Sequence, residues 1–138
     1  MLQRLSLLFL LIVGSAHFAF AQPRRSGGDP EIRKLKIDYV TGQMKLAPAQ
    51  MQKFVPLYDQ YSGELFQYRR AIRELDRNPN KDFSVEQRQK LEQQIVTIKG
   101  AYKNRFLAII TPEQLAAMYK AEGEFKSILL ENLKNRKR

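Results

Sequence analysis

One helical stripe constrains the fold more than any other feature of the sequence. Between Met51 and Leu75, large apolar residues recur at alternating steps of three and four positions. This spacing keeps all of them on one side of an α-helix over about seven turns. The stripe consists of Met51, Phe54, Tyr58, Tyr61, Leu65, Tyr68, Ile72 and Leu75. The sequence therefore predicts a helix from Pro48 to about Asp76 that packs along its whole length.

A second long stripe follows after a short polar turn, "RNPNKDF", at residues 77–83. Ser84 and Gln87 form a capping box there, and the helix is predicted to run to about Ile110. Its apolar residues are Leu91, Ile95, Ile98, Tyr102, Phe106 and Ile109. Because the turn is short, the two long helices are expected to lie antiparallel, with Met51 facing Ile109, Phe54 facing Phe106 and Tyr58 facing Tyr102.

Two further helices are predicted on either side of this hairpin. The first runs from Pro30 to about Lys45, with Asp29 as its N-cap, and the last from Pro112 to about Leu133. The apolar residues of the first are Ile32, Leu35, Tyr39, Val40 and Met44, and those of the last are Leu115, Met118, Tyr119, Phe125 and Leu129. The expected fold is all-α, a single helical domain at residues 30–138 that ends in a basic tail and follows a flexible leader at 22–29.

The first 21 residues have the pattern of a secretory signal peptide. Arg4 precedes the apolar run Leu5–Val13, which is too short to span a bilayer alone, and the small-x-small motif Ala19–Ala21 follows. We expect cleavage before Gln22 and export to a bacterial periplasm. The alternative is an uncleaved membrane anchor. No cysteine follows the apolar run, which excludes a lipoprotein anchor.

The residue types that the chain lacks limit the catalytic groups and metal ligands that it could provide. It contains no cysteine, and its one histidine, His17, lies in the predicted signal peptide. Thiol nucleophiles, the commonest general base and the commonest transition-metal ligands are thus missing from the mature chain. No serine lies in a G-x-S-x-G motif, and no phosphate-binding glycine loop is present. We therefore expect no enzymatic activity, cofactor or metal site, and we expect Met44, Met51 and Met118 to lie in the core.

A five-residue motif occurs twice, as "LAPAQ" at residues 46–50 and "ITPEQ" at 110–114. Each copy reads as a corner made of an apolar residue, a cap, a helix-starting proline and a glutamine that reaches back to the cap. The corner residues are Leu46, Pro48, Gln50, Ile110, Thr111, Pro112 and Gln114. In an antiparallel hairpin both corners lie at the same end, where they can pack together. The alternative is that they are simply two efficient helix starts.

These motifs resemble the paired L-T-x-x-Q motifs of the Spy/CpxP family of small periplasmic proteins. The segments "KFVPLYDQY" (53–61) and "YKAEGEFKSILLENLKNRKR" (119–138) are similar to a Bacteroidetes-type group labelled as sensors of extracytoplasmic-function sigma factors. The resemblance covers most of residues 30–134. It departs from the family pattern at Ala47, where threonine is expected, and at Ile110, where leucine is expected.

The resemblance implies a curved helical hairpin that is usually dimeric. Spy-type members bind unfolded polypeptides on a concave basic surface without ATP, and CpxP-type members also damp a stress-sensing kinase. Some relatives sense heavy metals through histidine, carboxylate or methionine ligands. The absence of histidine from the mature chain argues against that metal-sensing branch.

The net charge of +10 is unevenly arranged along the two long helices. Pairs such as Glu86 with Lys90 and Glu122 with Lys126 are spaced to form ion pairs within a helix. Six other cations form like-charged rows, namely Arg69, Arg70, Arg73, Arg77, Lys99 and Lys103. One interpretation is a positive surface that attracts acidic or unfolded polypeptides. The other is an ordinary solvated face of a basic protein.

Two hypotheses for the function follow. The first is a holdase-like chaperone or envelope-stress protein that binds unfolded or envelope polypeptides on the basic surface. The second is a regulator that binds a membrane sensor kinase or an anti-sigma factor. Apolar residues off the main stripes favour a homodimer over an exposed patch. An export signal argues against nucleic-acid binding, and the tail "KNRKR" is expected to make at most peripheral contact with anionic lipid.

Overall fold

The computed structural model describes residues 28–78 and 84–137, and it is all-α in these segments, as the sequence predicts. The helices are α1 (Pro30–Met44), α2 (Pro48–Arg77), α3 (Ser84–Leu107) and α4 (Pro112–Asn135). The predicted helix bounds are correct to within three residues. The predicted signal peptide, all but the end of the leader, most of the turn between the long helices and Arg138 lie outside the described residues.

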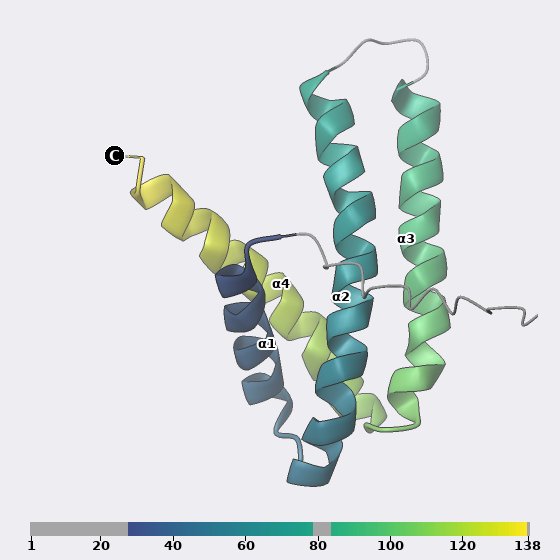
Figure 1. Cartoon of the computed structure of the whole chain (residues 1–138), viewed down its shortest axis with the longest axis vertical. Helices are drawn as coiled ribbons and strands as arrows, with labels where there is room; N and C mark the ends of the chain where they lie inside the picture. The colour runs from purple at the N-terminus through teal and green to yellow at the C-terminus, as the bar shows by residue number, and fades with distance from the viewer. Residues whose placement is uncertain (1–27, 79–83, 138) are drawn as a thin grey trace, which may run out of the picture.

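The four helices form two antiparallel pairs that meet at one end (Figure 1). α2 packs chiefly against α3, as the hairpin prediction requires, and α1 packs chiefly against α4. The pairs converge where the α1–α2 and α3–α4 connections lie, at the bottom of Figure 1, and α4 diverges from α2 and α3 toward the other end. We call the converging end the closed end, and we call the distal parts of α2, α3 and α4 the arms.

The core fills the closed end with rings stacked between the pairs of helices. Phe54 and Phe106 lie 5.5 Å apart between ring centres, and Tyr61 meets Phe106 edge-on at 5.2 Å. α1 and α4 contribute aliphatic and methionine side chains. The buried hydrophobic residues are Val40, Met44, Phe54, Tyr58, Tyr61, Leu65, Tyr102, Phe106, Ile110, Leu115, Met118 and Ala121. Each helix therefore buries part of one stripe, and all four stripes meet at the closed end.

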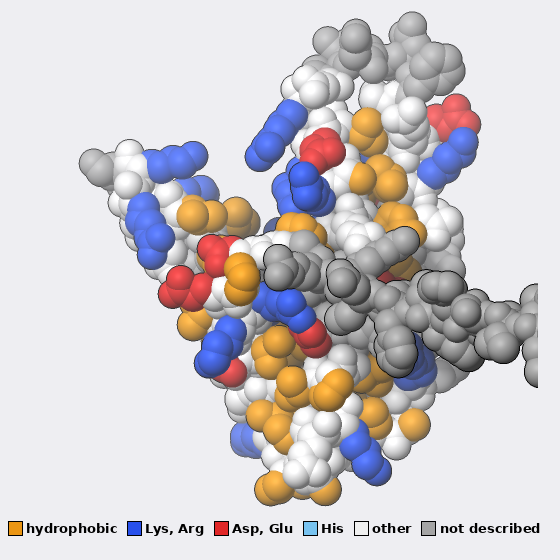
Figure 2. Space-filling view, in the orientation of Figure 1, with side chains coloured by type: hydrophobic (Ala, Val, Ile, Leu, Met, Phe, Trp, Pro, Cys, Tyr) orange, Lys and Arg blue, Asp and Glu red, His pale blue; other side chains and the backbone are white. Residues whose placement is uncertain are grey.

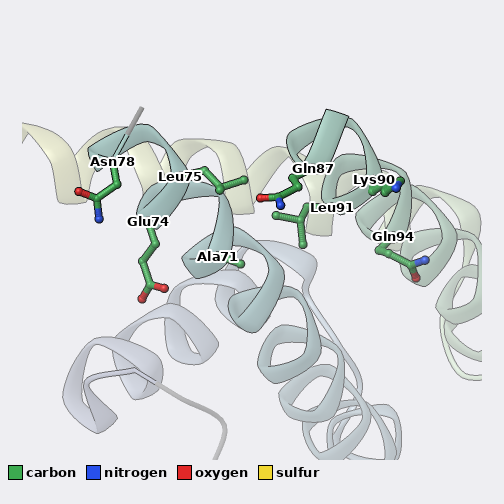
Figure 3. Close-up of a pocket in the computed structure, with 8 residues that line it drawn as sticks. All are labelled: Ala71, Glu74, Leu75, Asn78, Gln87, Lys90, Leu91 and Gln94. Atoms are coloured by element: carbon green, nitrogen blue, oxygen red, sulfur yellow. The ribbon is translucent and has the colours of Figure 1, made fainter. Parts of the chain in front are cut away.

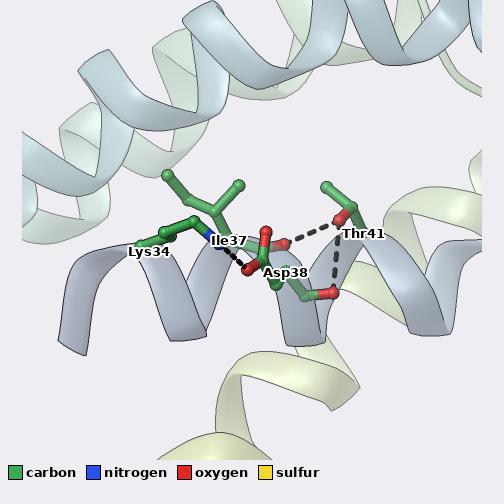
Figure 4. Close-up of polar contacts among 4 residues, drawn as sticks. All are labelled: Lys34, Ile37, Asp38 and Thr41. Carbon is green, nitrogen blue, oxygen red and sulfur yellow. Dashed lines mark hydrogen bonds and ion pairs between the residues drawn. The ribbon is translucent and has the colours of Figure 1, made fainter. Parts of the chain in front are cut away.

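Of the apolar residues predicted for α1, Val40 and Met44 lie in the core, whereas Leu35 does not. Val40, Thr41 and Met44 are buried and Ile37 packs against the core, whereas Leu35 is 54% exposed. The residues of α1 that pack inward are Ile37, Val40, Thr41 and Met44, which share one side of the helix. This is the side that α1 buries as it packs chiefly against α4. The buried Thr41 hydroxyl donates to the carbonyl of Ile37 at 2.7 Å, within the same helix (Figure 4).

Two further side-chain predictions need correction, whereas the facing of Phe54 and Phe106 is confirmed. Met51 is 39% exposed, because the first turn of α2 lies at the outer edge of the closed end, so only two of the three methionines are in the core. Tyr102 packs against Tyr61 at 5.3 Å between ring centres, one turn further along α2 than the predicted Tyr58. The hairpin register therefore drifts by about one turn away from the closed end.

Candidate functional site

The two corners meet at the closed end through their glutamines. Gln50 Nε2 donates to Gln114 Oε1 at 2.9 Å, and Gln114 Nε2 donates back to Gln50 Oε1 at 3.1 Å. Each Oε1 also accepts a hydrogen bond from the backbone N–H of its own cap, Ala47 or Thr111, at 3.0 Å. Gln50 Nε2 additionally donates to the carbonyl of Ile109 at 3.2 Å. The repeated motif thus couples two helix starts directly to each other.

The two caps differ as their sequences predict. The Thr111 hydroxyl accepts from the Gln114 N–H at 3.1 Å, so the second corner has a complete capping box. Ala47 has no side-chain oxygen, so the first corner keeps only the bond from its own N–H to Gln50. Pro48 and Pro112 occupy the first helical turns, while Leu46 and Ile110 pack at the core. All seven corner residues therefore serve the junction of the four helices.

A polar cluster lies where the two pairs of helices begin to separate. Glu122 of α4 accepts a hydrogen bond from the Tyr58 hydroxyl at 3.0 Å and lies 3.6 Å from Lys36 Nζ. The Glu122 side chain is only 11% exposed, so it faces α1 and α2. It therefore does not form the predicted pair with Lys126, whose side chain is exposed. We call Lys36, Tyr58 and Glu122 the junction cluster.

The charges around the junction cluster are positive on balance. Burial lowers the pKa of Lys36, Glu122 opposes that effect, and the nearby charges of Arg69 and Lys99 lower the pKa further. The cluster thus brings Arg69 and Lys99 near the same buried amine, although they come from different helices. Burial also raises the pKa of Tyr58 well above its usual range, and Glu122 adds to the rise. The Lys36 amine therefore lies near two further cations and contacts one carboxylate, that of Glu122.

The predicted basic residues extend from this cluster along α2 and α3. Arg70, Arg73, Arg77 and Lys103 are exposed, and Arg69 and Lys99 are half-buried. Arg70 pairs with Glu74 at 3.0 Å, whereas the other five form no ion pair with another described residue. The Arg73 guanidinium lies 5.5 Å from the Phe66 ring centre, and Lys99 Nζ lies 5.9 Å from that of Tyr119. The surface therefore combines cations with aromatic rings.

The space-filling view shows a notch between the free end of α4 and the hairpin (Figure 2). Lys and Arg side chains gather along the distal part of α2, on the edge that borders this notch. A groove of about 530 Å³ lies between the distal ends of α2 and α3 (Figure 3). Leu75, Leu91 and Ala71 give the groove apolar walls, and Glu74, the partner of Arg70, lies at its edge.

Sequence reasoning missed Lys36 and misplaced Glu122. Lys36 lies four residues after Ile32 and three before Tyr39, so a charged residue occupies a helical stripe of apolar positions. Glu122 likewise lies four residues after the buried Met118 and three before Phe125. A charge within an apolar stripe was the available signal, since such a charge is buried only with a partner.

Comparisons with family models, curated proteins and solved structures find no match to this chain. Within residues 28–78 and 84–137, no group of three or more carboxylates is arranged to hold a metal ion. No helix in this part of the chain is long and apolar enough to cross a membrane.

Proposed function

We propose that the chain is an exported, ATP-independent holdase-like protein of the Spy/CpxP type, which captures unfolded polypeptides weakly and reversibly. The observation that carries this proposal is the row of cations on the arms, set among aromatic rings and largely without acidic partners among the described residues. Like charges at this spacing destabilise a helix by a few tenths of a kcal/mol for each pair, so the row has no local stabilising role.

An unfolded polypeptide offers the complementary groups. Its acidic side chains are attracted by Arg69, Arg73 and Arg77, which add to a long-range positive field. Its apolar side chains can lie against Phe66, Tyr119 and the arginine stems, or in the groove between Leu75 and Leu91. Because these contacts are few and partly solvated, capture is weak and release requires no energy source.

The test measures suppression of the aggregation of a chemically denatured protein by the wild-type chain. Suppression is expected to weaken between about 0.1 M and about 0.5 M salt, because exposed charges are screened. The triple variant Arg69→Glu, Arg73→Glu, Arg77→Glu is expected to abolish suppression. A matched triple variant, Lys45→Glu, Lys53→Glu, Lys120→Glu, changes the net charge equally on exposed positions elsewhere and should retain it.

Circular dichroism shows whether each triple variant remains folded, and a second set with glutamine in place of glutamate separates charge loss from charge reversal. Unchanged suppression by the arginine variant would reject the proposed surface. A wild-type chain without suppression that recovers one defined membrane protein from envelope extracts would instead favour the regulator of a sensor kinase or anti-sigma factor.

A further inference from the structure

The distal part of α4 carries an exposed stripe that the proposed function does not use. Lys126, Leu130, Leu133 and Lys134 are spaced at steps of four, three and one residues, so they share one side of the helix, and Lys137 follows three residues later in the turn after Asn135. All five are exposed, with Leu130 at 50% and Leu133 at 45%. We call these five residues the α4 stripe.

From residue 124 onward, the acidic residues of α4 lie on the side of the helix opposite the α4 stripe. Glu124, Ile128 and Glu131 follow one another at steps of four and three residues, half a turn away from the α4 stripe. Glu124 accepts a hydrogen bond from the Tyr39 hydroxyl at 3.0 Å, which directs this opposite side toward α1. The α4 stripe is therefore both apolar and purely basic, and it lies on a helix that diverges from the hairpin (Figure 1).

We propose that the α4 stripe docks onto the surface of an anionic lipid bilayer. Leu130 and Leu133 enter the boundary between headgroups and acyl chains, and the three lysines extend their stems so that the ammonium groups stay among the lipid phosphates. α4 then lies along the membrane plane without crossing it, and Glu124 and Glu131 face away from the negative headgroups.

The composition of the α4 stripe favours lipid over a protein partner. The residues that dominate the binding energy of protein interfaces are mainly Trp, Tyr and Arg, whereas leucine is under-represented among them and lysine is depleted from interfaces. Lysine is a flexible point charge with no planar fork for a fixed carboxylate, and it suits mobile phosphate groups. Two exposed leucines between three lysines thus match a fluid anionic surface. This inference is independent of the polypeptide-binding proposal, because it uses different residues.

The test uses the full chain and vesicles of phosphatidylglycerol or of phosphatidylcholine, with co-sedimentation as the readout. Binding is expected on the anionic vesicles only and should weaken as salt is raised. The variant Lys126→Glu, Lys134→Glu should reduce binding at least about tenfold. The variant Leu130→Gln, Leu133→Gln should reduce it by a similar factor of about ten.

Matched controls come from exposed residues off the stripe. Ile128→Gln removes an apolar side chain that is 43% exposed on the opposite side, and Lys53→Glu, Lys120→Glu reverses two exposed charges. Both controls should bind the anionic vesicles like the wild type. Since the chain has no tryptophan, Leu133→Trp supplies a single tryptophan whose emission should shift to the blue on anionic vesicles.

Three results would each overturn the proposal. The first is the absence of binding to phosphatidylglycerol vesicles, and the second is equal binding to both lipids. The third is an equal loss of binding in the stripe variants and their controls. A dimer in solution that is lost only in the leucine variant, without vesicle binding, would assign the stripe to a second copy of the chain and also reject the lipid proposal. Aggregation suppression should be unchanged in the stripe variants, so the two proposals can fail separately.

Discussion

The parts of α2 and α3 at the closed end and the parts in the arms are packed very differently. In α2 the large buried side chains run from Phe54 to Leu65, and in α3 the buried residues are Tyr102 and Phe106. Beyond these, no described residue at 66–77 or 84–101 is buried. The apolar stripe nevertheless continues along α2 to Leu75. The same periodicity therefore makes a four-helix core at one end and a two-helix ridge at the other.

This difference shows that the burial of an apolar stripe depends on how many other helices pack against it. At the closed end α1 and α4 cover the hairpin, and the paired glutamines hold all four helices together. In the arms only one neighbouring helix is available, so residues such as Leu91 and Ile95 remain half-exposed. Stability is thus concentrated at the closed end, and the cations, rings and leucines of the arms remain at least partly exposed.

The largest expected effect is on the free energy of unfolding, when a large apolar side chain is truncated at the closed end and, for comparison, in an arm. Phe106→Ala removes a fully buried ring that meets Phe54 and Tyr61, and it should lower the free energy of unfolding by about 3–5 kcal/mol. Leu91→Ala in the arm should lower it by about 1 kcal/mol, because that side chain is already half-exposed. Urea denaturation measures both variants. Equal losses would mean that the arms are as tightly packed as the closed end.

The next effect is alkaline destabilisation of the closed end through its tyrosines. Burial and the hydrogen bond that Tyr102 donates to Glu64 at 2.6 Å raise the pKa of Tyr102 to about 12, from 10.0 in the unfolded chain. The folded state therefore binds more protons between these values. The stabilisation is fully present below pH 10 and is lost as the pH rises toward 12, at up to about 1.4 kcal/mol for each pH unit.

Urea midpoints between pH 9 and about pH 11 test this sign, together with tyrosinate absorbance. Tyr102→Phe should be less stable at neutral pH but should lose less stability on going to alkaline pH. Tyr68→Phe in the arm is the control, because Tyr68 lies outside the buried core. Stability that rises with pH through this range would contradict the assigned direction.

The paired glutamines give a smaller effect that is specific to the closed end. Gln50→Ala leaves the Gln114 amide and the Ala47 N–H without their partners, which should lower the free energy of unfolding by about 2 kcal/mol. The double variant with Gln114→Ala should lose less than the sum of the two single variants, since both remove the same bonds. Gln52→Ala, an exposed residue on the same turn, is the control. Additive losses would show that the corners act separately.

Much of this architecture was predictable because it depends on periodicity. Steps of three and four residues between apolar positions identified both long helices, and the repeated motif identified the two corners and their common end. The side-chain details depend on which neighbour covers each helix, and no single sequence states this. Met51, which the sequence predicts in the core, and Leu35, an apolar residue of α1, are both exposed for that reason. Glu122 was paired with Lys126 because its true partners, Tyr58 and Lys36, lie 64 and 86 positions away in the chain.

The smallest effect comes from repairing the weaker corner. In Ala47→Thr, the new hydroxyl can accept from the Gln50 N–H as the Thr111 hydroxyl accepts from that of Gln114, and Ala47 already has the extended backbone of a cap. The gain should be about 1 kcal/mol, which raises the melting temperature by several degrees. Ala47→Val has the same branched shape without an acceptor and should give no gain. If both substitutions stabilise the chain equally, packing at the closed end rather than capping limits the first corner, and the two copies of the motif differ in more than their cap.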